Sequence, residues 1–129
     1  MRLLLDTHAL LWWWADDARL GIAARTAIAD EGNEVLVSAA SAWEIATKQR
    51  LGKLAAQPAD AGEFAALLRA DGFGHLAVTH RHAWQAGSLA VEHRDPFDRM
   101  LAAQAQLEGL VLVSVDPVFA GEFGQRVLW

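Results

Sequence analysis

The fold class can be predicted from Leu3–Trp14, whose sequence is LLLDTHALLWWW. Three leucines without polar alternation are typical of a strand that is buried on both faces of a parallel sheet. The apolar run ends abruptly at Asp6, and three consecutive tryptophans follow within eight residues. A buried carboxylate and a row of indoles both need partners, so other parts of the molecule must cover them.

The same strand pattern returns further along the chain. Apolar runs like the one at Arg2–Leu5 occur at 34–37 and 110–113, with a shorter one at 76–78 and an edge strand predicted at 126–129. Helical spacing between these runs predicts helices at residues 7–15, 22–30, 42–51, 61–70, 81–89 and 96–107. Alternating strands and helices predict an α/β sandwich with a mostly parallel central sheet and right-handed crossovers.

The overall composition is that of a globular protein. With 129 residues, of which 53% are hydrophobic and 21% charged, we expect a single domain that spans residues 1–129. No apolar stretch approaches the roughly 18 residues that cross a bilayer, and the N-terminus does not resemble a secretion signal. We therefore expect a cytoplasmic protein with no membrane partner.

Charge and cysteine content narrow the chemistry. A formal net charge of −5 disfavours a protein whose main role is to coat duplex DNA, because such proteins carry a basic face. It leaves open an enzyme that cuts nucleic acid with bound cations. The chain has no cysteine, so any metal ion must be held by oxygen or imidazole.

Four acids are placed where a ligand site is expected. Asp6 and Asp116 come directly after predicted strands, and Glu44 and Asp98 fall in the first turns of predicted helices. In an open α/β sheet the site lies outside the carboxyl ends of the strands, so these acids can converge. Clustered carboxylates repel one another, and a hard divalent cation with a preference for oxygen relieves this repulsion.

Most of these acids also have a structural explanation. Ser41–Glu44 matches a capping box, and Asp95–Asp98 reads as an N-cap, a proline at the first helical position and an acid at the third. Asp116 before Pro117 matches the cap of a short turn. Asp6 matches no such pattern, so capping explains it least well.

Three longer stretches resemble one known family. They are LLLDTHALLWW at 3–13, EVLVSAASAWEIATKQRLGKL at 34–54 and HRDPFDRMLAAQAQLEGLVLVSVDPVF at 93–119. These stretches are similar to those of PIN-domain proteins, specifically the VapC-type toxins of bacterial type II toxin–antitoxin modules. The resemblance runs from Arg2 to Trp129. It implies a Rossmann-like α/β/α sandwich and an endoribonuclease that uses Mg²⁺ or Mn²⁺ to hydrolyse RNA phosphodiester bonds.

The resemblance also implies the site residues. The family's catalytic and metal-binding acids fall on Asp6, Glu44, Asp98 and Asp116. Many relatives carry a polar residue just before the fourth acid and a further acid two positions after it. Val115 and Val118 stand at those positions here, so a fifth carboxylate is missing.

Auxiliary roles are expected for four neighbours. Asp95 reads as an N-cap first and as a water-mediated ligand second. Thr7 and Ser114 place hydroxyls beside the acids, where they can orient a carboxylate or bond the backbone. His8 can contact substrate, or it can have a structural role or be solvated. His80, His82 and His93 form no ligand set in the sequence.

Basic and aromatic residues suggest where partners bind. Lys48, Arg94 and Arg99 lie close to the acids in sequence and either contact single-stranded RNA or form ordinary helix surface. Consecutive residues of a helix point about 100° apart, so at least one of Trp12, Trp13 and Trp14 should be exposed in a monomer. We expect these tryptophans, with Trp43, to form an interface with a second copy or with a VapB-type antitoxin, while one or two of them pack in the core.

Two other functions compete with the ribonuclease. A phosphatase of the haloacid-dehalogenase kind also begins with a strand that ends in Asp, but it needs a second Asp two residues later, where this chain has His8. A non-catalytic PIN-like interaction module would need no metal. Metal-dependent RNA cleavage distinguishes that module from an enzyme.

Overall fold

The computed structural model describes residues 1–129 and has one five-stranded sheet. Its strands are β1 (Arg2–Leu5), β2 (Glu34–Ser38), β3 (Gly74–Leu76), β4 (Val111–Val113) and β5 (Val127–Leu128). They lie in the order β3-β2-β1-β4-β5, and every neighbouring pair is parallel. The predicted α/β class with a mostly parallel sheet is therefore confirmed, as is the C-terminal edge strand.

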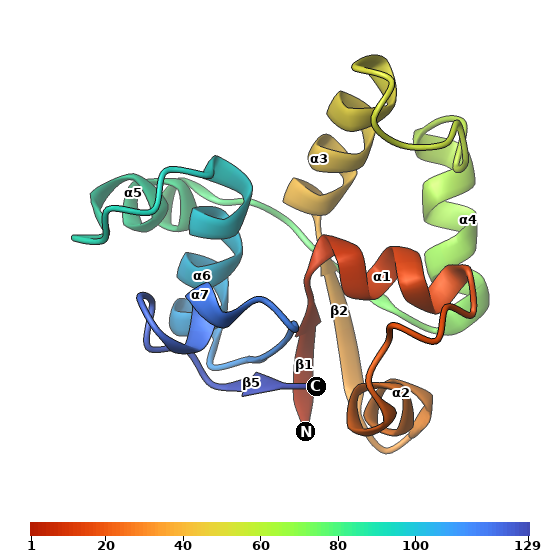
Figure 1. Ribbon diagram of the computed structural model, residues 1–129, viewed down its shortest axis with the longest axis horizontal. Helices are drawn as coiled ribbons and strands as arrows, with labels where there is room; N and C mark the ends of the chain where they lie inside the picture. Colours follow the sequence, from red (N-terminus) through yellow and green to blue (C-terminus); the bar gives the residue numbers. More distant parts are fainter.

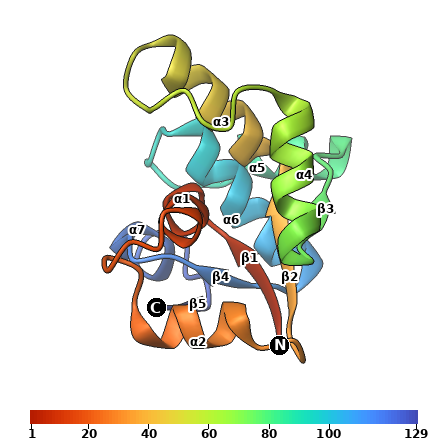
Figure 2. The same cartoon turned by 90° about the vertical axis from the view of Figure 1, so that its right-hand side faces the viewer.

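Seven helices surround the sheet. They are α1 (Thr7–Trp14), α2 (Ile22–Ala29), α3 (Ala39–Arg50), α4 (Ala61–Asp71), α5 (His80–Ser88), α6 (Pro96–Glu108) and α7 (Pro117–Ala120). Figure 1 views the sheet along its plane, with α1, α2 and α4 on one side and α5, α6 and α7 on the other. Figure 2 shows α1, α2 and α4 in front of the sheet and α3 rising beyond the end of β2. The layers are those of an α/β/α sandwich. None of the helices combines the length and apolar character of a membrane span.

Each face of the sheet has its own apolar cluster. Leu3 and Leu5 belong to the cluster under α1, α2 and α4, whereas Leu4 belongs to the cluster that includes Leu101 of α6 and Phe119 of α7. Successive strand residues point to opposite faces, and all three leucines are fully buried. The run of apolar residues in β1 therefore has a direct cause, because helices cover both faces of this strand.

The third helix begins earlier than predicted. Ser38 is its N-cap, and the Ser38 hydroxyl accepts a hydrogen bond from the Ala40 amide at 3.0 Å. Glu44 therefore lies in the second helical turn, and the predicted capping box at Ser41–Glu44 is wrong. A capping box occurs instead at the start of α5, between Thr79 and His82.

Two further elements differ from the prediction. Strand β3 lies at Gly74–Leu76 rather than at 76–78. A Cβ at Gly74 would approach Leu36 Cδ2 to 2.7 Å, so the glycine permits close packing of β3 on β2. The short helix α7 was expected only as a turn, and it forms where Asp116 caps a segment that begins with Pro117.

The strand register brings the polar ends of β1, β2 and β4 together. Leu5 pairs with Val37 on one side and with Val113 on the other, so Asp6, Ser38 and Ser114 follow at the same edge. The Asp6 amide donates to the Val113 carbonyl at 3.1 Å. This edge of the sheet carries the candidate site.

Candidate active site

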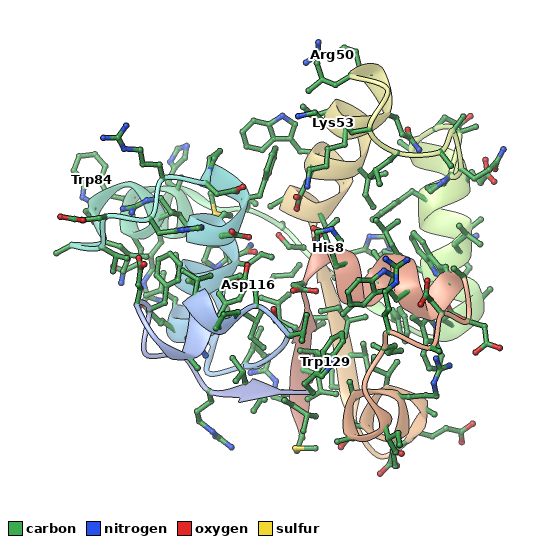
Figure 3. The ribbon with its side chains drawn as sticks, viewed as in Figure 1. His8, Arg50, Lys53, Trp84, Asp116 and Trp129 are labelled. Carbon is green, nitrogen blue, oxygen red and sulfur yellow. The ribbon has the colours of Figure 1, made fainter.

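A pocket of about 380 Å³ opens at the carboxyl edge of the sheet. All four predicted acids line it, although they come from separate parts of the chain. Figure 3 shows His8 and Asp116 on either side of the end of β1. The ten lining residues are Asp6, Thr7, His8, Glu44, Lys48, Asp95, Asp98, Val115, Asp116 and Pro117.

Asp6 is the N-cap of α1, a structural role that its sequence pattern did not indicate. Its Oδ1 accepts a hydrogen bond from the Ala9 amide at 2.7 Å. Burial raises the pKa of Asp6, hydrogen bonds from Ser114 and Ala9 and the charge of His8 lower it, and the charge of Asp98 raises it. Burial is the largest of these effects, so the ionised carboxylate is held at an energetic cost.

Glu44 is paired with a cation from its own helix. The Glu44 side chain is 7% exposed, and its Oε2 lies 2.5 Å from Lys48 Nζ one turn later. Lys48 therefore neutralises a pocket acid here, a role that the sequence did not suggest for it. The lysine still lines the pocket.

Asp98 is paired with His93, a residue that the sequence reasoning had set aside. His93 Nε2 lies 2.8 Å from Asp98 Oδ2, and the histidine ring packs edge-on against Phe123. Burial raises the pKa of Asp98, the His93 hydrogen bond lowers it, and the charges of Asp95 and Asp116 raise it. The bond to Asp98 raises the pKa of His93. The HRDPFDR stretch contained the signal, since the histidine sits just before the cap of α6.

The predicted caps at Asp95 and Asp116 are confirmed. Asp95 Oδ1 accepts from the amides of Phe97 and Asp98, and Asp116 Oδ1 accepts from the Val118 amide at 3.0 Å. A carboxylate has about four lone-pair sites on two oxygens, so a cap bond leaves capacity for a metal ion. Capping and metal binding are therefore compatible at these positions.

The remaining neighbours are held in defined contacts. The Thr7 hydroxyl donates to Ser41 Oγ at 3.0 Å, and Ser114 Oγ accepts from the Asp116 amide at 3.0 Å. Ser114 also lowers the pKa of Asp6. His8 is exposed at the pocket and its ring lies 5.6 Å from that of Trp12.

Two arginines near the acids have different surroundings. Arg94 is exposed, as an RNA contact would require. The prediction for Arg99 is wrong, because its guanidinium donates to five backbone carbonyls and is thereby occupied. These belong to Ala86, Gly87, Leu89, Val91 and His93. Arg99 fastens the segment that carries His93 to the start of α6.

The three consecutive tryptophans are all partly covered, so the expectation that one of them is exposed is wrong. Their ring partners come from distant segments: Trp12 meets Trp129, Trp13 meets Phe73, and Trp14 meets Phe64. Trp14 Nε1 also donates to Asp71 at 3.0 Å. Trp12 and Trp14 still border an open groove of about 610 Å³ with Leu11, Leu54 and Arg19.

Trp43 does not line this groove. It packs against Phe97 of α6, with ring centroids 4.6 Å apart, and remains 56% exposed. The most exposed tryptophan is Trp84 on α5, at 83%, and it lies away from His8 and Asp116 in Figure 3. Only Trp43 adjoins the pocket acids in sequence.

The pocket fits a hard divalent cation by its donor chemistry. Asp6 and Asp98 have pKa values raised by burial, with further increases from neighbouring acids, and a cation would relieve this. As they stand, no three Asp, Glu or His side chains are close enough to hold an ion. Glu44 Oε2 is bonded to Lys48 and Asp98 Oδ2 to His93, and each carboxylate keeps a second oxygen, so metal binding requires the pocket acids to move closer together but leaves the His93–Asp98 bond possible.

Comparisons with known proteins agree with this fold. A curated relative, Ribonuclease VapC16 of Mycobacterium tuberculosis, is 43% identical over 58 residues, which are 45% of this chain and 41% of that protein. The match thus spans about two fifths of that relative's length.

Solved structures match almost the whole chain. VapBC2 from Rickettsia felis bound to a promoter DNA fragment has a TM-score of 0.66 at 14% identity, over 99% of this chain and 98% of that one. VapBC-1 from nontypeable Haemophilus influenzae has a TM-score of 0.67 at 15% identity, over 99% and 97%. At such identities the likeness concerns the fold alone. The PIN domain family model matches residues 3–121, and the chain therefore belongs to the PIN domain family.

Proposed function

We propose that this chain, as one PIN domain over residues 1–129, is an endoribonuclease that uses Mg²⁺ or Mn²⁺ to hydrolyse RNA phosphodiester bonds. The observation that carries the proposal is the convergence of Asp6, Glu44, Asp98 and Asp116 on one pocket from four separate segments. The partial match to a protein named Ribonuclease VapC16 supports the same reaction.

The four acids would hold the cation through carboxylate oxygens, with Asp95 as an additional acceptor at the rim. A bound divalent cation in such a site neutralises charge on the phosphate and activates an attacking water. Ser114 and Thr7 orient the acidic edge through the hydrogen bonds described above. Val115 and Val118 carry no donor atoms, so the chain supplies no fifth carboxylate there.

Lys48 and Arg94 are the proposed RNA contacts. Lys48 lines the pocket and is bonded to Glu44, so a cation that takes over Glu44 would free the ammonium group for a phosphate oxygen. Arg94 is exposed directly before Asp95. Single-stranded RNA suits such a site, because its backbone can bend into a pocket.

We further propose that the protein is the toxin of a toxin–antitoxin module, acts in the cytoplasm and forms a homodimer. Support comes from the similar structures, whose names describe VapBC complexes. The groove beside Trp12 and Trp14 would receive apolar side chains of a VapB-type antitoxin. A basic antitoxin residue that reached the neighbouring acids would block the substrate.

The alternative is a non-catalytic PIN module. A phosphatase remains disfavoured, because His8 stands at the position of its required acid and contacts Trp12. RNA cleavage distinguishes the alternative from the proposal.

The test is cleavage of single-stranded RNA by the purified chain with Mn²⁺, with Mg²⁺ and with a chelator. We expect cleavage only with a metal, and a loss of roughly 10²-fold or more for Asp6→Asn and Asp98→Asn, since each removes a ligand charge. Asparagine preserves the cap at Asp6, so the fold should survive. Asp60→Asn is the matched control, because Asp60 caps α4 and does not line this pocket. Equal cleavage by all variants, or none by the wild type, would favour the non-catalytic module.

A further inference from the structure

An aromatic pair, the exposed Trp43 and the partly buried Phe97, joins the two helices that carry Glu44 and Asp98. Trp43 precedes Glu44 on α3, and Phe97 precedes Asp98 on α6. Their ring centroids are 4.6 Å apart and their planes make an angle of 72°, an edge-to-face contact. The pair therefore adjoins two acids of the pocket in sequence, while neither ring lines the pocket itself.

This pair is not needed for the core. Neither Trp43 nor Phe97 belongs to the two apolar clusters or to the residues packed against them. The tryptophans of α1, in contrast, all pack against the larger cluster. More than half of the Trp43 surface faces solvent while Phe97 holds its ring in place. A fixed, exposed indole is well suited to a flat ligand.

The surroundings favour RNA over a protein partner. The adjoining pocket has a single hydrophobic residue among the ten that line it. Lys48 and Arg94 supply positive charge beside the acids, and they flank the aromatic pair in sequence on α3 and before α6. Basic side chains combined with an exposed aromatic ring form the usual platform for single-stranded nucleic acid.

We propose that Trp43 is a stacking subsite for an unpaired base of the RNA next to the cleaved bond. Phe97 is a positioning residue that fixes the indole. The inference rests on the proposed function, and it specifies the substrate as RNA with a splayed base at that place. Stacking tolerates every base, so this subsite selects for an unpaired strand more than for a sequence.

The experiment compares kcat/KM for a single-stranded oligonucleotide among the wild type, Trp43→Ala, Trp43→Phe and Trp84→Ala. We expect Trp43→Ala to lower kcat/KM about 5- to 100-fold, mainly through KM, whereas Trp43→Phe retains most of the activity. Trp84→Ala is the matched control, because Trp84 is more exposed, is not adjacent to any pocket acid in sequence and lies away from His8 and Asp116 in Figure 3. Equal kinetics for Trp43→Ala and Trp84→Ala would overturn the subsite.

A second measurement uses the unchanged protein, so it does not depend on how the variants fold. Oligonucleotides that lack one base are compared position by position around the cleaved bond. One abasic position should lower wild-type kcat/KM as much as Trp43→Ala does, and it should cause little further loss in that variant. No sensitive position would contradict the proposal.

The remaining outcomes are also distinguishable. If the wild type cleaves no RNA, the proposed function fails. If the wild type cleaves and only the subsite tests fail, the inference alone is wrong. Sedimentation provides a third arm: a shift from dimer to monomer in Trp43→Ala, with unchanged RNA kinetics, would assign Trp43 to contact with a second copy instead.

Discussion

Helix α6 carries a histidine–carboxylate pair at each end, and the two pairs serve different purposes. At the N-terminal end His93 bonds Asp98, and at the C-terminal end His82 bonds Glu108, each with a separation of 2.8 Å between nitrogen and oxygen. Identical chemistry and distance thus occur in two surroundings. Comparing the two pairs distinguishes a contact that stabilises the fold from a contact that serves the pocket.

The His82 pair belongs to a packed polar network. His82 Nδ1 accepts from the Thr79 amide at 3.1 Å, so Nε2 carries the proton that is donated to Glu108. Gln104 Nε2 lies 3.3 Å from the same Nδ1, and the Gln104 Oε1 atom is buried without a partner. The imidazole joins α5 to α6 in one fixed tautomer. This end of the helix is organised for stability.

The His93 pair lies where negative charge is in excess. The side chains of His93 and Asp98 are 27% and 22% exposed, and Asp95, Asp116 and Asp6 are the neighbouring acids. Burial and the charges of Asp95 and Asp116 raise the pKa of Asp98, and His93 only partly offsets this effect. Two hydrogen bonds of the same length therefore have different roles. The His82 bond completes a packed polar network, whereas the His93 bond offsets part of the negative charge around Asp98.

The largest expected effect is on the free energy of unfolding, and it tests the difference between the His82 and His93 pairs directly. His82→Leu should lower the free energy of unfolding by about 3 kcal/mol, because it leaves the Thr79 amide and Glu108 without their partner and removes one of the two acceptors of Gln104 Nε2. His93→Leu should cost less than about 1 kcal/mol, since its pair is partly exposed to solvent. Urea unfolding of both variants measures this. A larger loss for His93→Leu would reverse the comparison.

The second prediction concerns metal affinity. His93 approaches Asp98 but does not line the pocket, so it can orient the carboxylate as an outer partner of a ligand does. His93→Leu should weaken Mn²⁺ binding about tenfold, and His93→Gln should restore most of the affinity by keeping a nitrogen donor. Titration calorimetry without RNA is the measurement, and His82→Leu serves as the control. Unchanged or tighter Mn²⁺ binding by His93→Leu would mean that His93 has a structural role only.

The smallest effect is the pH dependence of stability at Asp6. The pKa of Asp6 is raised above its usual 3.8 in the folded protein, so the folded state binds more protons than the unfolded state. Stability from this group is present below pH 3.8 and falls as the pH rises through the folded pKa. Metal-free Asp6→Asn should therefore gain stability relative to the wild type as the pH increases, since its cap is preserved.

Urea unfolding with a chelator across a pH series measures this difference. Asp6→Ala is the control for capping and should lose about 1 kcal/mol at every pH relative to Asp6→Asn. A constant difference between the wild type and Asp6→Asn across the series would contradict the raised pKa.

Part of the site was predictable because its causes are local. The buried strands were evident from runs such as Leu3–Leu5, and the acids followed from their place at the strand ends. The caps at Asp95 and Asp116 depend only on the next two or three amides, so the sequence was sufficient. Even so, the choice between Ser38 and Ser41 as the cap of α3 needed the strand register, which extends β2 to Ser38.

By itself the sequence determined the α/β class, the edge of the sheet where the acids meet, and the caps that begin α6 and α7. Only the tertiary structure decided that Phe64, Phe73 and Trp129 cover the three tryptophans, and that His93 bonds Asp98 while Arg99 fastens the segment before it. The physical reason is the distance along the sequence between the residues that interact. Strand and cap patterns depend on nearby residues, whereas covering an indole or pairing a buried carboxylate depends on which distant segments the packed layers bring into contact.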